Sequence, residues 1–509
     1  MACESAVLSA LGGRPRRALD VARALTADKK SVNRILYALE TQGKVRRHEG
    51  TPPLWEKAVP HAVAPTVLPS PPAEASAWQA QQVTSMTMHQ LSTSQMVETG
   101  PPGAAHAPTD SLPRAAPAEA HASDNAPEAA LWAQQCASAI WNTFNALNPD
   151  TSGKQVVAGF VVREGGSPRV VSLGSGTRSA TGNRLSLEGR VVHDSHAEVV
   201  ARRGLLRWLY AELEKASSRA EGSVATLASG PKPFALLSKL DVWLYISLAP
   251  CGDAAIFSHS DPRASSIASG AAWSTPKHGV LRTKIESGQG TLPVPAETVL
   301  TLDGLQRGDR LLSHSCSDKV AKWAVAGVQG ALLSRLIGPL YLSGVVVSDL
   351  FAHGHLCRAL CCRSHRALDS AGVVVEAPYH MQHVQVLHAP IPHGASSRHQ
   401  QIQKTSRFSI NWAERDAAAE LVDGGTGLQT DGSPPRIAKA SLFASFCRIC
   451  PEGASSSYVH NKVQAVTYQR VKRTWTAAMM ASQFGLWVCK PCEISEFTCV
   501  SSKCLFSNP

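Results

Sequence analysis

Apolar residues recur along this chain with two different spacings, and each spacing predicts a different type of element. Near the N-terminus, Val32, Ile35, Leu36 and Leu39 recur every three or four residues, which is the spacing of one face of a helix. Two shorter helical stretches precede them, and residues 44–59 have the pattern of two short strands joined by a turn. Three helices followed by a pair of strands predict a winged helix-turn-helix over residues 1–60.

A second pattern begins at about Ala130, where strand-like runs alternate with longer helical ones. The short apolar runs "QVVAGFVV", "RVVSL", "DVWLYISLAP" and "GVVVSDLF" are typical of buried strands. The stretches "HAEVVARRGLLRWLYAELEKA" and "KVAKWAVAGVQGALLSRLI" have helical patterns. The alternation predicts an α/β domain over residues 127–509.

Residues 61–126 show neither pattern and separate the two units. They are rich in Ala, Pro, Ser, Thr and Gln, and a segment of this composition cannot bury enough apolar surface to fold, so we predict a disordered tether. The longest apolar stretch, "LIGPLYLSGVVVSDLF", contains Gly, Pro, Ser and Asp, and we therefore expect no membrane partner. The N-terminus lacks the pattern of a secretory signal, so we expect the protein in the nucleus, the cytoplasm or both.

The formal net charge of +11 is unevenly distributed, with +5 on residues 1–60, −4 on residues 61–126 and +10 on the remainder. Basic segments on both sides of an acidic tether suggest that each unit binds a polyanion. A solvated basic surface without a partner is the alternative. The thirteen Cys residues are an odd number at irregular spacings, which favours buried thiols and metal ligands over a disulfide framework.

The stretch "VVHDSHAEVV" places His196 and Glu198 on either side of one alanine, at the edge of an apolar segment. A catalytic zinc needs three protein ligands and an open position for water. Cys251 in "APCGDAA" and Cys316 in "SHSCSDK" each follow an apolar run and precede a helix, where the helix dipole stabilises a thiolate. Because 65 residues separate the two cysteines, spacing alone leaves a buried, metal-free His and Cys set as the alternative.

The words "HAE", "PCGDA", "LRTKIESG", "SCSDK" and "GVQGALLS" occur in this order, and together they resemble the adenosine deaminases acting on RNA. The resemblance runs from about residue 130 to 495 and is loose in two stretches, "SHRALDSAGVVVEAPYHMQHVQ" and "TSRFSINWAERDAAAELVDGGTG". It implies a cytidine-deaminase-like α/β/α domain, with one zinc on His196, Cys251 and Cys316. It also implies that Glu198 moves protons while adenosine becomes inosine in double-stranded RNA. A non-catalytic deaminase-like RNA-binding protein and a tRNA adenosine deaminase are the alternatives.

The same resemblance implies a buried inositol hexakisphosphate. The implied contacts are Arg202, Arg203, Lys319, Lys322, Trp323, Gln329, Lys439, Tyr458, Lys462, Tyr468, Lys472, Trp487 and Lys490. Acidic residues that flank this site in the family are replaced by Cys489 and Ser495. "CRIC" and "CKPC" offer another interpretation, a second zinc on Cys447, Cys450, Cys489 and Cys492.

The N-terminal stretch "KKSVNRILYALETQGKVRRHEGTPPLW" resembles the Z-alpha domain, which binds left-handed Z-form DNA or RNA. The resemblance implies nucleic-acid contacts by Lys29, Lys30, Asn33, Arg34, Tyr37, Thr51, Pro52, Pro53 and Trp55. A winged helix that reads B-form DNA, or one that binds a protein, is the alternative.

Further nucleic-acid contacts are implied in the deaminase region at Thr177, Gln289 and Arg310. In the family, the loop of "TKIESGQGT" enters the duplex where the target adenosine has flipped out, and its tip is usually Glu. Gln289 stands at that tip here, and an amide donates hydrogen bonds without first taking up a proton. We find no segment resembling a double-stranded RNA-binding domain, so we expect duplex RNA to contact the deaminase surface directly. A homodimer is also considered.

Overall fold

The computed structural model describes residues 4–12, 16–27, 32, 33, 35, 36, 39, 40, 44–48, 54–57, 126–147, 153, 155–180, 184–237, 240–256, 273, 277–285, 291–294, 310–392 and 405–499. The chain divides into two compact units, residues 1–112 and 113–509, and each is described by itself. The predicted tether lies outside the described residues up to position 125.

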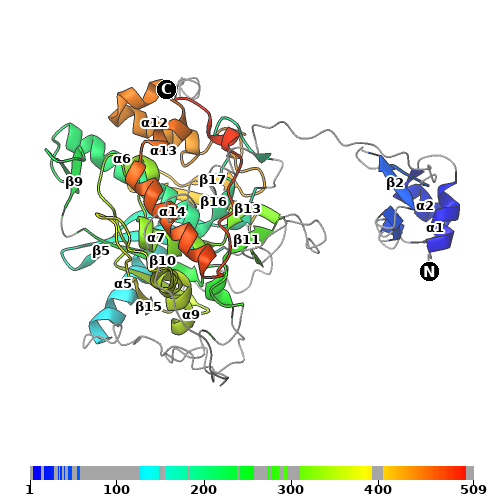
Figure 1. The fold of residues 1–509 in the computed structure, drawn as a ribbon, viewed down its shortest axis with the longest axis horizontal. Helices are drawn as coiled ribbons and strands as arrows, with labels where there is room; N and C mark the ends of the chain where they lie inside the picture. The colour runs from blue at the N-terminus through cyan, green and yellow to red at the C-terminus, as the bar shows by residue number, and fades with distance from the viewer. Residues whose placement is uncertain are drawn as a thin grey trace, which may run out of the picture. The chain divides into compact units, whose positions relative to one another are not determined.

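The described part of the N-terminal unit combines helical segments with a three-stranded sheet (Figure 1). Its helical parts are α1 (Glu4–Leu11), α2 (Ala18–Ala24) and residues 32, 33, 35, 36, 39 and 40. The strands β1 (Arg16–Arg17), β2 (Val45–His48) and β3 (Leu54–Lys57) pair antiparallel in the order β1-β3-β2. Val32, Leu36 and Leu39 are completely buried, as their spacing predicts. The winged helix-turn-helix is confirmed.

A seven-stranded sheet organises the large unit, in the order β15-β14-β10-β4-β5-β16-β17. Its strands are β4 (Val157–Glu164), β5 (Ser167–Ser175), β10 (Asp241–Leu248), β14 (Gly344–Asp349), β15 (Gln385–His388), β16 (Phe408–Ala413) and β17 (Glu420–Asp423). β10, β14 and β15 run parallel to one another, and the other neighbouring strands pair antiparallel. The strands predicted from the four apolar runs are β4, β5, β10 and β14.

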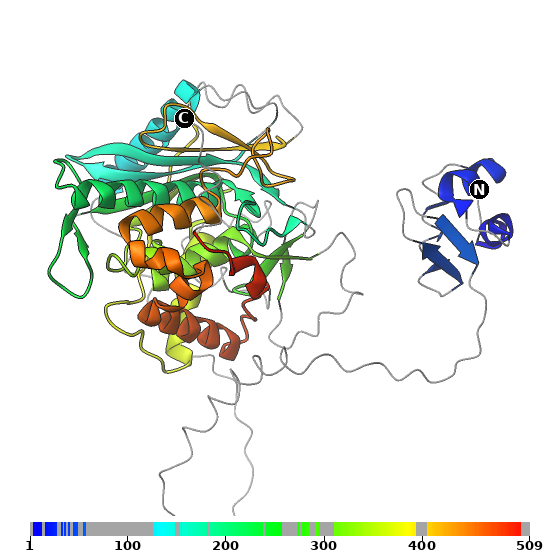
Figure 2. The same cartoon turned by 90° about the horizontal axis from the view of Figure 1, so that it is seen from above.

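Helices cover both faces of this sheet, because its central strands alternate between two apolar cores. On β4, Phe160 packs in the core shared with α6 (Ala197–Ser217), whereas Val161 packs in the core shared with α5 (Ala126–Leu147). Figure 2 shows α5 and α6 on opposite sides of the sheet, with the C-terminal helices beyond α6. The predicted α/β/α layering is confirmed.

Smaller elements complete the described part of the large unit. In chain order they are β6 (Thr177–Ser179), β7 (Asp194–His196), β8 (Ala225–Leu227), β9 (Phe234–Leu236), the 3₁₀ turn η3 (Asp253–Ala255), β11 (Arg282–Ile285), β12 (Thr291–Pro293), β13 (Arg310–His314), α7 (Cys316–Ala326), α8 (Gly330–Leu333), α9 (His353–Cys357), the π-turn η7 (Arg358–Cys362), α10 (Arg363–Ser370), α12 (Lys439–Ile449), the 3₁₀ turn η8 (Pro451–Ser455), α13 (Tyr458–Val463), α14 (Val466–Ala481) and the 3₁₀ turn η9 (Cys492–Ser495).

One predicted helix differs from the structure. The stretch from residue 319 to 337 was expected to form a single helix, but α7 ends before Gly327, whose φ is +75°, and α8 begins three residues later. A positive φ is a conformation that glycine adopts without strain, so this residue ends the helix. Within the described ranges, no helix is both long enough and apolar enough to cross a membrane.

Candidate active site

Three secondary-structure boundaries bring His196, Cys251 and Cys316 together. His196 ends β7 and immediately precedes α6, Cys251 lies three residues beyond the end of β10, and Cys316 is the first residue of α7. Their ligand atoms all lie within 4.8 Å of one another, and Cys251 Sγ is 3.9 Å from His196 Nδ1. The predicted set therefore converges, although the two cysteines are far apart in the sequence.

The two cysteine loops touch because the residue after Cys251 is a glycine. Gly252 has a φ of +103°, and a Cβ at this position would overlap Ser315 Oγ. The close approach lets the Ser317 N–H donate to the Cys251 carbonyl at 3.1 Å. The Cys316 N–H points to Cys251 Sγ at 3.4 Å, as expected for a sulfur at a helix N-terminus.

Lys284 of β11 connects the cysteines to Asp194. Its Nζ lies 2.7 and 2.8 Å from the two carboxylate oxygens of Asp194 and 3.5 Å from Cys316 Sγ. Lys319 also pairs with Asp194. A hydrogen bond from Cys316 holds the pKa of the Cys251 thiol well below its usual range. Burial opposes this shift, and the charge of Lys284 adds to it. A site with thiolate character and an imidazole fits a borderline-soft divalent cation such as zinc.

Glu198 lies in the first turn of α6, two residues after His196, and is 3% exposed. Burial raises the pKa of its carboxyl above the usual range, and the neighbouring Cys251 adds to this effect. A positioned carboxyl of this kind can both accept and return a proton during one reaction cycle. The site thus combines a convergent set of metal-ligand side chains with an adjacent acid–base group.

Comparison with known proteins assigns the chain to a family. The adenosine-deaminase (editase) domain matches residues 172–491, and the adenosine deaminase z-alpha domain matches residues 2–60. The chain belongs to the adenosine-deaminase (editase) family. The domain match contains His196, Glu198, Cys251 and Cys316, so the convergent site is part of the family domain.

Similar editase-family proteins include RNA-specific and tRNA-specific enzymes. The chain is 35% identical over 385 residues to the double-stranded RNA-specific adenosine deaminase of Mus musculus, covering 72% of this chain and 32% of that protein. It is 35% identical over 360 residues to the double-stranded RNA-specific editase Adar of Drosophila melanogaster, covering 68% and 52%. The tRNA-specific adenosine deaminase 1 of Homo sapiens is 25% identical over 448 residues, covering 64% and 88%. The chain thus spans about a third to a half of the length of the first two relatives.

The nucleic-acid contacts predicted for this editase-family chain have different outcomes. Thr177 pairs in register with His196 across the β6–β7 ladder, which places it beside the candidate metal site. Asn33 is half-buried on its helical segment. Trp55 is completely buried in the core of the N-terminal unit, and its nucleic-acid contact stays a prediction. Residues outside the described set are Lys29, Lys30, Arg34, Tyr37, Thr51, Pro52, Pro53 and Gln289, as is the side chain of Arg310.

The editase-family domain gathers cations near α6, α7, α13 and α14. We call them the basic cluster: Arg202, Arg203, Lys319, Lys322, Lys439, Lys462, Lys472 and Lys490. Burial, followed by the charges of Lys472 and Arg202, holds the pKa of Lys322 well below its usual range. Burial and then neighbouring cations lower the pKa values of Lys439 and Lys490 to about 7. Among the described residues, Lys319 is the member of the cluster that forms an ion pair, with Asp194.

Aromatic side chains line the basic cluster. Trp487 lies 4.0 Å from Lys322 Nζ, Tyr458 lies 5.1 Å from Lys462 Nζ, and Trp323 lies 5.2 Å from the Arg202 guanidinium, measured to the ring centroids. Tyr468 is buried nearby. Gln329 is also buried, and its amide bonds to the backbone at Ala326 O and Leu340 N, so it supports the polypeptide around the cluster.

The two CxxC pairs do not converge. Cys447 and Cys450 are buried near the end of α12, whereas Cys489 and Cys492 are exposed. The Cys450 thiol donates to Glu452 at 2.8 Å instead of facing the other pair. Besides the candidate active site, a convergent set of metal-ligand type in the described part of the chain is Cys361, Cys362 and His383, which the sequence patterns did not single out.

Proposed function

We propose that this chain catalyses the zinc-dependent hydrolytic deamination of adenosine to inosine in double-stranded RNA. The convergence of His196, Cys251 and Cys316 beside Glu198, inside a matched editase domain, carries the proposal. The names of the mouse and fly relatives support the substrate class. The human tRNA-specific relative represents the rival substrate class, and the N-terminal z-alpha match favours the first.

Each side chain of the site has a role in the proposed reaction. His196, Cys251 and Cys316 would hold one zinc, which when bound acidifies a water molecule and so supplies the nucleophile. Glu198 accepts the proton of that water and delivers protons to the purine ring and to the leaving nitrogen, so that adenosine and water yield inosine and ammonia. Lys284, paired with Asp194, lies 3.5 Å from Cys316 Sγ, where its charge favours the thiolate and opposes burial, which raises the pKa of this thiol.

The Glu198→Gln variant tests this assignment, because the amide keeps the shape of the side chain but cannot exchange the proton. We expect about one zinc per chain in both proteins and a loss of inosine formation in the variant, measured by sequencing a long RNA duplex for A-to-G changes. A transfer RNA serves as the second substrate. Inosine formed by the variant at the wild-type rate would exclude Glu198 as the proton carrier. If the wild-type protein formed inosine only in the transfer RNA, the result would favour a tRNA adenosine deaminase.

We further propose that the basic cluster holds an inositol hexakisphosphate as a structural cofactor. The mutual repulsion of half-buried Lys322, Lys439 and Lys490 supports the proposal, because a polyanion placed among them would make several charge-assisted hydrogen bonds. Replacement of family acidic residues by Cys489 and Ser495 alters its edge, where Ser495 Oγ lies 3.4 Å from Lys439 Nζ.

We also propose that the N-terminal unit recruits the enzyme to Z-form RNA or DNA. The z-alpha match and the net charge of this segment support the proposal. Asn33→Ala combined with Tyr37→Ala should reduce editing of alternating purine–pyrimidine duplexes far more than editing of mixed-sequence duplexes. Equal losses on both duplexes would identify a general phosphate binder, whose affinity falls steeply with salt in either case.

A further inference from the structure

Each candidate cysteine ligand is followed two residues later by a completely buried aspartate. Asp253 follows Cys251 in "CGD", and Asp318 follows Cys316 in "CSD". Each carboxylate pairs with an arginine that is itself buried, Arg358 for Asp253 and Arg363 for Asp318. Burying four charges is costly unless each one is held in good geometry by its partner.

The Asp253 pair fixes the Cys251 loop through side chain and backbone together. Arg358 Nε donates to Asp253 Oδ2 at 2.8 Å, and Arg358 Nη2 donates to the Asp253 carbonyl at 2.6 Å. The other carboxylate oxygen, Oδ1, accepts the Gly279 N–H at 2.7 Å. Three hydrogen bonds therefore hold Asp253, which lies in the 3₁₀ turn directly after the Cys251 loop.

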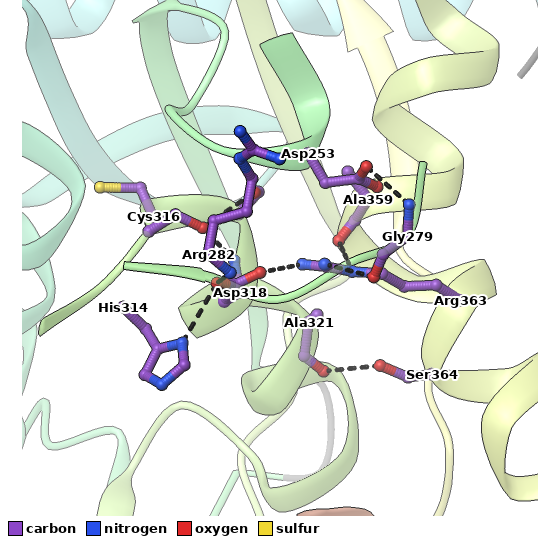
Figure 3. Close-up of polar contacts among 12 residues, drawn as sticks. Asp253, Gly279, Arg282, His314, Cys316, Asp318, Ala321, Ala359, Arg363 and Ser364 are labelled. Carbon is purple, nitrogen blue, oxygen red and sulfur yellow. Dashed lines mark hydrogen bonds and ion pairs between the residues drawn. The ribbon is translucent and has the colours of Figure 1, made fainter. Parts of the chain in front are cut away.

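The Asp318 pair fixes the start of α7 in the same way. Asp318 Oδ1 accepts from Arg363 Nη2 at 2.7 Å, and Oδ2 accepts from the Arg282 N–H at 2.8 Å and from His314 Nδ1 at 3.3 Å. Figure 3 shows the Arg363 guanidinium between Asp318 and the backbone of Gly279, whose carbonyl accepts from Nη1 at 3.1 Å. Gly279 thus links the two arginine–aspartate pairs.

One arginine begins a π-turn, and the other directly follows its end. Arg358 begins η7 and Arg363 follows it, five residues later. In an α-helix, residues five apart point about 140° away from each other. A π-turn closes hydrogen bonds between residues five apart, which brings such residues to one side. The widened turn therefore lets one element reach both cysteine loops, and Arg363 Nε also bonds to Ala359 O within the turn.

We propose that Arg358, the first residue of η7, and Arg363, the first residue of α10, are positioning residues that hold the Cys251 and Cys316 loops at metal-binding separation. The role rests on the proposed zinc site and concerns how that site is held together. Neither guanidinium is an expected metal ligand, so each acts through the aspartate that follows a ligand. Supports of this kind keep a ligand set ready, and their loss typically weakens metal binding by about 10–100-fold.

The test compares lysine substitutions in and away from the site. Arg358→Lys and Arg363→Lys keep the charge but lose the forked hydrogen bonds. Arg207→Lys is the matched control, because Arg207 makes two bonds to Asp416, at 2.8 and 2.9 Å, between α6 and the segment after β16. Zinc transfer from the folded holoprotein to an excess of chromogenic chelator is followed well below the melting temperature, and the melting temperature of each protein is measured in parallel.

We expect zinc release to be about 10–100-fold faster in Arg358→Lys and Arg363→Lys, with Arg207→Lys within about twofold of wild type at a comparable melting temperature. If both site variants release zinc at the rate of the control, the positioning role of Arg358 and Arg363 is wrong, and the proposed reaction is unaffected. A wild-type protein that holds no zinc would instead overturn the proposed reaction. If the lysine variants do not fold, Asp253→Asn and Asp318→Asn are measured in the same way. Failure of all four variants to fold, beside a folded Arg207→Lys, would reduce the arginines to a purely structural role.

Discussion

Among single residues, Gly252 controls how closely the two cysteine loops approach. Its φ of +103° lies in the region that disfavours residues with a side chain, and a Cβ would meet Ser315 Oγ and Ser317 Oγ. Both constraints act directly beside Cys251. A change at this one position therefore tests whether the contact between the loops is needed for metal binding.

Gly252→Ala should lower the free energy of unfolding and weaken zinc binding. The backbone conformation alone, with φ +103° and ψ −141°, costs about 1–3 kcal/mol with a Cβ, and the overlap with the serines adds about 1–3 kcal/mol. Gly222→Ala is the matched control, because Gly222 has a φ of +71° and open space around its Cβ position. Denaturant unfolding and zinc content are measured for both. Equal unfolding losses with full zinc content in both variants would contradict the role of the close contact.

The chemistry-bearing residues could be predicted from the sequence, but their supports could not. His196, Glu198, Cys251 and Cys316 stand in short words that resemble a family, so their residue types and order were informative. Lys284 lies in one of those words without any local sign that its amine would reach Asp194 and Cys316. Such contacts depend on tertiary placement, which a pattern within one segment does not encode.

Among the elements, α5 is joined to the sheet by a buried polar chain as well as by apolar packing. Trp141 Nε1 donates to the Tyr245 hydroxyl of β10 at 2.8 Å, and that hydroxyl bonds to Ser348 Oγ of β14 at 2.8 Å. These hydrogen-bonded side chains lie in the core on the α5 side of the sheet, whereas Glu198 belongs to α6 on the other side. A substitution of Tyr245 should therefore change the stability of the protein without changing the rate of catalysis.

Tyr245→Phe should lower the free energy of unfolding by about 1–3 kcal/mol, because Trp141 and Ser348 both lose a buried hydrogen-bond partner. The rate of inosine formation should stay near the wild-type value. The double variant Trp141→Phe with Tyr245→Phe is the control, and it should lose less than the sum of the two single changes because both partners of one bond are absent. Strictly additive losses would show that this bond contributes little.

Element types followed from the sequence more readily than element boundaries and special turns. The apolar runs of β4, β10 and β14 are dense enough to predict buried strands. The apolar pattern continues on both sides of Gly327, so the sequence predicted one helix where the structure has α7 and α8. The π-turn η7 could not be predicted from local sequence, because its neighbouring Arg358 and Arg363 pair with Asp253 and Asp318, which are far away in the sequence.

For the whole molecule, the basic cluster makes stability depend on pH, and this dependence should differ between the protein with and without a bound polyanion. With the pKa values of Lys439 and Lys490 lowered to about 7, the folded protein without an anion binds fewer protons than the unfolded chain between about pH 7 and 10.5. These two lysines therefore destabilise this form progressively as the pH falls from about 10.5 toward 7. A bound polyanion favours the charged lysines and should remove this loss.

Protein refolded without inositol phosphates should thus have a melting temperature that falls from pH 9 to pH 7, and added inositol hexakisphosphate should flatten that dependence. The same titration with Lys462→Ala, which removes one cation from the cluster, should need more of the anion for the same effect. Addition of sulfate at equal ionic strength controls for general screening. A melting curve that is indifferent to the added anion at every pH would contradict a polyanion site.

The anchoring of the β11–β12 hairpin has a consequence for how specificity can change. Arg282 bonds through its backbone to Asp318 and through its side chain to Thr291, while Lys284 faces Asp194 and Cys316. The base of the hairpin is therefore part of the metal-site framework, whereas residues 286–290, which include Gln289, lie outside the described residues. Substitutions confined to those five sequence positions leave every named residue of that framework unchanged. A library confined to them should alter which adenosines are chosen while zinc content stays constant.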